Sequence, residues 1–137
     1  MIDLKSIRDR IIGLDYFLSV ADSPAAAEAM EQFNALPPAA FVSTASERAD
    51  PNMLATGHRQ RVNQTISVLF VIGAERASRD NVDPMEEARS LLLRSLVAWT
   101  PQGSLKPLDY VSYSLRFIDQ GLLWGELLFI GTYTVSG

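Results

Sequence analysis

The chain has 137 residues, one histidine, no cysteine and a formal net charge of −4. The length and the 47% of hydrophobic residues predict one folded domain over 1–137, neither a disordered tail nor a fibrous repeat. The missing cysteine excludes disulfides, thiol nucleophiles, iron–sulfur clusters and cysteine-ligated zinc, and the acidic balance argues against a nonspecific hold on nucleic acid.

The first part of the chain carries alternating helix and strand signals. Isoleucines and leucines recur at helical spacing in the first fourteen residues, and Gly13 marks the expected end of that helix. The apolar run 15–21 predicts a short strand. Ser23 is a suitable N-cap with Pro24 behind it, which predicts a second helix over 25–33.

A strand, a polar loop and a longer strand are expected next. Two large apolar residues favour a strand over 39–44, and the turn residues of the most polar stretch predict a mobile loop at 43–58. From Arg59 to Ile72, apolar and polar residues alternate until both faces become apolar. This pattern predicts a strand that begins half-exposed and ends buried under a helix or under a partner subunit.

The third expected helix has the clearest start. Asp83 is placed as its N-cap, Pro84 as its first residue and Glu86 as the capping-box residue. An apolar stripe then runs at helical spacing to the expected end at Thr100-Pro101. Because the second half of this helix is apolar nearly all round, it needs more cover than one sheet provides.

Two strands, 111–117 and 122–135, are expected to close the chain as an antiparallel hairpin. In the first of them, Val111, Tyr113 and Leu115 would form the buried face. The order of elements predicts the α+β class, with a mostly antiparallel sheet of four to five strands and two to three helices packed on it.

No motif for catalysis or cofactor binding emerges. His58 is the only imidazole, and Asp50 and Ser46 are its nearest candidate partners, but no nucleophile motif surrounds them. We therefore expect a solvated loop histidine, with a small hydrolase as the alternative. Four acidic residues between 80 and 87 lack the spacing of a calcium loop and suit a helix start better. Catalytic, metal and cofactor sites are expected to be absent.

Neither a secretory signal nor a membrane span is expected. Charged residues interrupt the first fourteen positions, so no apolar signal core can form there. The longest apolar stretch, 122–130, contains Glu126 and is shorter than the roughly twenty residues of a membrane helix.

Six residues are candidates for a subunit or partner interface. Arginine is enriched at protein contacts, and four arginines bracket the long central strand. Trp124 and Leu128 share one face of a final strand that is apolar on both faces. The alternative explanations are contact of the arginines with passing nucleic acid, a merely solubilising role for them, and cover of the final strand by the third helix. The candidates are Arg59, Arg61, Arg76, Arg79, Trp124 and Leu128.

Five segments together resemble the tail terminator (minor tail protein U-like, tail completion) proteins of long-tailed bacteriophages and prophages, from about Leu14 to Val135. Turns, strand starts and a helix end carry this resemblance. The segments are Leu-Pro-Pro-Ala-Ala-Phe-Val at 36–42, Arg-Gln-Arg-Val at 59–62, the charged turn 76–80, Trp-Thr-Pro at 99–101 and Leu-Asp-Tyr at 108–110.

The resemblance implies a structural protein without catalysis or cofactor. Such proteins have an α+β fold and form a ring, usually a hexamer, on the head-proximal end of the tail tube. The implied partners are further copies of the chain, the tail tube protein and the head–tail connector, with DNA only passing through. The implied place is the tail or neck of a virion assembled in the bacterial host cytoplasm. A neck, head-completion, tube or baseplate protein is the rival interpretation.

Overall fold

The computed structural model describes residues 1–22, 36–73, 83–119 and 121–137. Two helices and five strands are seen in these ranges, which confirms the α+β class. In chain order they are α1 (Leu4–Ile12), β1 (Ser19–Asp22), β2 (Ala39–Ala49), β3 (Arg59–Gly73), α4 (Pro84–Leu96), β4 (Asp109–Asp119) and β5 (Leu122–Ser136). The helix expected over 25–33 lies outside the described residues.

The strands form one sheet in the order β1-β2-β3-β5-β4. The β1–β2 pair is parallel and the three other pairs are antiparallel, so the expected mostly antiparallel sheet is confirmed. The longest pairing joins β3 to β5 over their full lengths, from Arg59 opposite Ser136 to Gly73 opposite Leu122. The two longest strands therefore form the centre of the sheet.

The main core lies between the helices and one face of the sheet. Ile7 and Ile11 of α1 and Leu92 and Leu96 of α4 are fully buried in it. They pack with alternate residues of β3, including Phe70, as the two-residue period of a strand requires. No helix of the described residues is long and apolar enough to cross a membrane.

A second, smaller cluster covers the opposite face of the sheet. It contains Ala39, Leu69, Val71 and Trp124, with Phe41 packed against it. Residues 66–72 of β3 are consequently buried on both faces of the sheet, as the sequence predicts.

Both described helices begin at an aspartate cap, and that of α4 is the expected Asp83. Asp3 accepts a hydrogen bond from the backbone N–H of Lys5 at 3.0 Å, and Asp83 accepts one from Met85 N–H at 3.0 Å. The predicted end of α4 at Thr100-Pro101 is wrong, because the helix ends at Leu96. Ala98 adopts φ 63° and donates its N–H to Leu108 at 3.0 Å, so the chain leaves the helix to contact that residue.

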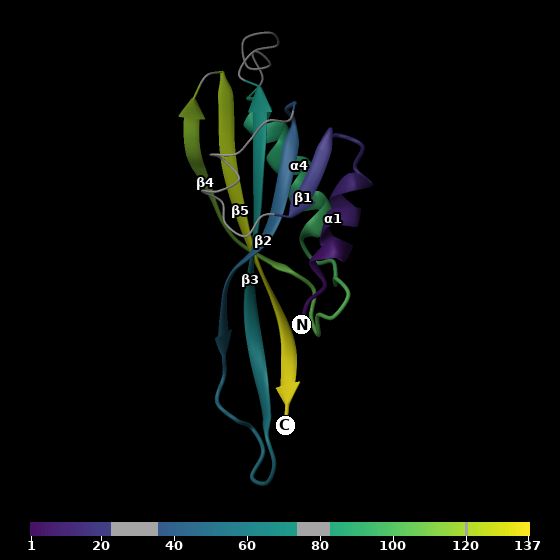
Figure 1. The fold of residues 1–137 in the computed structure, drawn as a ribbon, viewed down its shortest axis with the longest axis vertical. Helices are drawn as coiled ribbons and strands as arrows, with labels where there is room; N and C mark the ends of the chain where they lie inside the picture. The colour runs from purple at the N-terminus through teal and green to yellow at the C-terminus, as the bar shows by residue number, and fades with distance from the viewer. Residues whose placement is uncertain (23–35, 74–82, 120) are drawn as a thin grey trace.

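The far halves of β2, β3 and β5 extend beyond the helices as a three-stranded projection (Figure 1). We call this projection, residues 46–64 and 131–137, the arm. The predicted loop at 43–58 is wrong in its first part, since β2 continues to Ala49 and only 50–58 connects the strands. A register shift between Thr44 and Ser46 lets β2 continue its pairing with β3 into the arm.

Candidate protein interface

The tip of the arm is a loop closed around the side chain of Asn52. Its Oδ1 accepts hydrogen bonds from the backbone N–H groups of Arg59 at 2.8 Å and Leu54 at 3.4 Å. Its Nδ2 donates to the carbonyls of Gly57 at 3.1 Å and Leu54 at 3.2 Å. Met53 and Leu54 remain 56% and 43% exposed on this hydrogen-bonded loop. The arm therefore ends in two apolar side chains held at the surface.

One face of the arm carries three arginines. Val62 and Tyr133 point toward the main core, so their neighbours Arg61 and Thr134 point to the other face. Residues paired across strands share a face, which places three arginines together on the side away from the helices. The pairs are Arg48 with Asn63, Arg61 with Thr134 and Arg59 with Ser136.

These arginines have no salt bridge to any carboxylate of the described residues. Arg48 and Arg59 are exposed, and Arg61 is partly buried. The Nε of Arg61 is shielded from solvent and has no hydrogen-bond partner within the described ranges. Asp50 lies on the same face, but its carboxylate accepts a hydrogen bond from Asn63 Nδ2 at 3.3 Å. The arm thus presents positive charge that nothing in the described chain pairs.

Trp124 is separated from the arm. Its ring is only 2% exposed and stacks on Phe41, with the ring centroids 6.2 Å apart. Its partner on β3 is Val71, at the end of the strand opposite Arg59. The structure therefore does not bring Trp124 together with Arg59 and Arg61. Their joint role in one interface stays a prediction, and Arg76 and Arg79 lie outside the described residues.

Leu128 lies on the same face of β5 as Trp124 and is partly exposed. Between these two residues, Glu126 accepts a hydrogen bond of 2.6 Å from Ser67 Oγ. Arg116 Nε lies 3.9 Å from the other oxygen of the same carboxylate. A charged group therefore interrupts the apolar face that the sequence pattern suggested.

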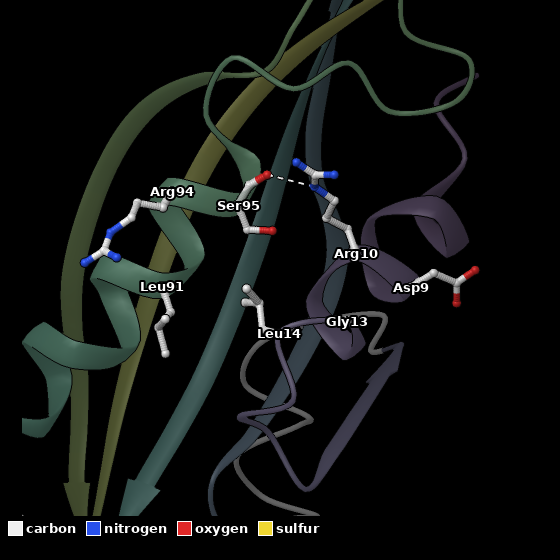
Figure 2. A pocket seen from close by; sticks show the side chains of 7 residues that line it. All are labelled: Asp9, Arg10, Gly13, Leu14, Leu91, Arg94 and Ser95. Carbon is white, nitrogen blue, oxygen red and sulfur yellow. Dashed lines mark hydrogen bonds between the residues drawn. The ribbon is translucent and has the colours of Figure 1, made fainter.

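An open groove of about 530 Å³ lies between α1 and α4 (Figure 2). Arg10 reaches from α1 to the end of α4, where its Nε donates to the Ser95 carbonyl at 3.0 Å. Its guanidinium also lies over the ring of Trp99, 4.9 Å from the centroid. Leu14 and Leu91 line the groove between the two helices. Besides these apolar side chains, the groove is lined by the cations Arg10 and Arg94 and by Asp9, whose carboxylate pairs with Lys5 at 3.3 Å.

The residues considered for hydrolysis are not assembled. His58 Nε2 hydrogen-bonds to Gln60 Oε1, while the Asp50 carboxylate bonds to Asn63. Among the described residues, Ser46 makes no hydrogen bond with either of them. In the same part of the chain, no group of three or more histidine, aspartate or glutamate side chains is arranged to hold a metal ion.

The outer edge of β4 is an exposed surface that the sequence pattern misassigned. Val111 and Leu115, predicted to be buried, are 52% and 50% exposed, and Tyr110 is 44% exposed. Register shifts on either side, after Tyr110 and after Leu115, break the simple alternation of the strand. Short-range periodicity holds no signal for such shifts, so this apolar edge could not be found from the sequence.

Comparison with known proteins gives the family. The family model "Phage tail terminator protein" matches residues 3–136. No curated protein sequence matches the chain significantly. One solved chain, from the "Virion of native gene transfer agent (GTA) particle", has 18% identity and a TM-score of 0.49 over 86% of this chain and 80% of that chain. Because the family match covers nearly the whole sequence, the chain belongs to the phage tail terminator protein family and is a structural component of the virion tail.

Proposed function

We propose that the protein caps the head-proximal end of the tail tube as a ring of identical copies, which ends tube polymerisation and forms the surface that joins the head. The family match over residues 3–136 is the observation that carries this proposal. We expect a hexamer, with the tail tube protein on one side and the head–tail connector on the other. No cofactor is required for this role.

Capping follows from surface complementarity. One face of the ring would match the last ring of the tube, and the opposite face would lack the docking surface that a further tube subunit needs. When each subunit binds the next through two different surfaces, the chain of subunits closes into a ring if the rotation from one subunit to the next adds up to a full turn. The arm and the exposed edge of β4 are suited to such contacts, because both carry exposed apolar side chains: Met53 and Leu54 on the arm, Val111 and Leu115 on β4.

The arm tip is our candidate for an element that contacts neighbouring protein. Because Asn52 already closes this loop, we expect contact to protect the backbone of 53–58 rather than to fold it. Hydrogen exchange of the tip, compared between free protein and capped tails, measures this effect. Unchanged exchange on assembly would remove the tip from the interface.

Electron microscopy of the purified protein, alone and mixed with tail tubes, tests the ring. We expect rings at one end of each tube and tubes of constant length. Deletion of the gene separates the proposal from its rival, because loss of a terminator gives overlong tails. Separate heads beside tails of normal length would instead identify a head-completion protein and contradict the proposal.

The net charge of −4 supports passage of DNA through the ring without tight binding. A strongly positive channel in the assembled ring would contradict this part of the proposal.

A further inference from the structure

The three arginines of the arm form a concentrated positive surface on an acidic protein. Arg59 and Arg61 are two residues apart on one strand, which places their Cα atoms about 7 Å from each other. Arg48 is a diagonal neighbour of Arg61 across the β2–β3 pair, at about 7–8 Å. Against these three positive charges the same face holds one negative charge, Asp50. We call Arg48, Arg59 and Arg61 the arginine face.

The arginine face is unfavourable in an isolated chain. Like charges on neighbouring strand positions repel each other, and none of the three guanidinium groups has a carboxylate within salt-bridge distance among the described residues. The Arg61 Nε is shielded from water and has no hydrogen-bond partner among the described residues. A carboxylate supplied from outside would compensate the repulsion, because guanidinium groups bind carboxylates through two parallel hydrogen bonds.

The first turn of α4 offers carboxylates of this kind. Asp83, Glu86 and Glu87 are all exposed. Asp83 caps the helix, whereas neither glutamate has a salt bridge to a described residue. Arg89, the next cation along the helix, lies over the Tyr113 ring at 4.2 Å from the centroid. We call Asp83, Glu86 and Glu87 the acidic turn.

The two surfaces lie at opposite ends of the molecule. In Figure 1 the arm projects at the lower end, and α4 begins near the upper end, beside the end of β3. This separation keeps the arginine face from reaching the acidic turn of its own chain. A contact between the two must therefore join different copies, head to tail, which is the type of contact that closes into a ring.

We infer that the arginine face of one copy binds the acidic turn of a second copy of the same chain. This inference rests on the proposed ring and names a contact that joins neighbouring subunits. It also explains how an arm with three unpaired arginines fits a protein that lets DNA pass, because the neighbour's carboxylates occupy the guanidinium groups in the ring.

Charge exchange between the two surfaces tests the inference. In the double variants R59E/R61E and E86R/E87R, like charges face each other, so we expect each to weaken assembly by about tenfold or more. The quadruple variant R59E/R61E/E86R/E87R again places opposite charges at the contact. We expect its assembly affinity to return to within about threefold of that of the unmodified protein. Sedimentation velocity of the protein alone and electron microscopy on tail tubes measure assembly.

A matched control changes charge elsewhere. The double variant R94E/K106E also converts two exposed cations to anions, and neither residue has a salt bridge in the described chain. It is expected to assemble normally. Circular dichroism of each variant reports its fold, and recovery in the quadruple variant shows by itself that the charge reversals left the fold intact.

The outcomes separate the inference from the proposed function. If R59E/R61E forms rings as readily as the unmodified protein, the inference is overturned and the ring stands. If R59E/R61E fails to assemble while E86R/E87R assembles normally, the arginines contact another partner and the inference is overturned. Arginine-dependent binding of duplex DNA at physiological salt would overturn it in favour of a phosphate contact. Absence of rings under all conditions would overturn both proposals.

Discussion

Tyr133 on β5 donates a hydrogen bond of 3.1 Å to Glu47 on β2, across the strand that separates them. The tyrosine is 8% exposed and lies opposite Val62 of β3. Glu47 pairs with Gln64 of the same strand. This contact connects the two outer strands of the arm close to its base, where the arm leaves the main core.

We expect the stability of the protein to fall at alkaline pH through Tyr133. Burial, and then the hydrogen bond and the negative charge of Glu47, raise the pKa of Tyr133 above 10.0. A pKa raised by folding gives stability that is fully present below the unfolded value and is lost as pH rises through the folded value. In the variant Y133F, this decrease in stability above about pH 10 should be absent.

Urea unfolding between pH 8 and 11 measures the effect, with Y110F as the control because Tyr110 is 44% exposed. At neutral pH, Y133F should lower the free energy of unfolding by about 1 kcal/mol, because the hydrogen bond to Glu47 is lost. Identical pH dependence in Y133F and in the unmodified protein would show that the contact is absent in solution.

Asn52→Ala should loosen the arm tip without unfolding the domain. The variant removes four hydrogen bonds that close the loop, each with a net value of about 1 kcal/mol in an exposed setting. We expect amide exchange at 53–58 to rise by about tenfold or more while the thermal midpoint changes little. T56A, in the same loop, should leave exchange unchanged. A large drop in midpoint would mean that the tip supports the core.

Gly103→Ala should destabilise the fold more than Gly121→Ala. Both glycines have positive φ, 90° and 78°, so alanine at either position costs about 1 kcal/mol in backbone strain. Only at Gly103 would the added Cβ also collide with the backbone, at the Met1 carbonyl, whereas no atom lies within 4 Å at Gly121. We expect a further loss of about 1–3 kcal/mol for G103A. Equal unfolding midpoints would contradict the close approach.

Trp124→Ala and Leu128→Ala separate a core role from an interface role on β5. Removing the buried Trp124 ring should cost about 3–5 kcal/mol of unfolding free energy. Leu128 is partly exposed, so L128A should cost less than about 1.5 kcal/mol. If Leu128 contacts a partner, L128A should weaken assembly while the midpoint is kept. A large effect of W124A on assembly with an unchanged midpoint would place Trp124 at the interface after all.

The start of α4, the end of α1 and the central strand could be predicted because a residue pattern within each segment marks it. Asp83-Pro84 sets the start of α4 through one side chain and one ring, and Gly13 ends α1. The alternation in β3 reflects burial on one face, and its apolar second half reflects burial on both. For each of these features, the residue pattern within the segment itself carries the signal.

The extension of β2 beyond Thr44 could not be predicted, although it forms part of the arm. Residues 45–49 are all exposed, so no apolar alternation marks them as a strand. They become a strand because β3 pairs with them through backbone hydrogen bonds, which carry no side-chain signal. For the same reason the arginine face could not be assembled from the sequence, since Arg48 lies next to Arg61 only in this register.

Composition, spacing and resemblance by themselves determined the class of this protein: an acidic, cysteine-free α+β protein of the tail terminator family. Only the tertiary structure decided which candidates are available to a partner. Trp124 is buried because Ala39, Leu69, Val71 and Phe41 pack around it on one face of the sheet. Arg59 and Arg61 have no salt bridge among the described residues, because the arm extends beyond the rest of the molecule. Burial and charge pairing depend on residues far apart in the chain, and for that reason they required the fold.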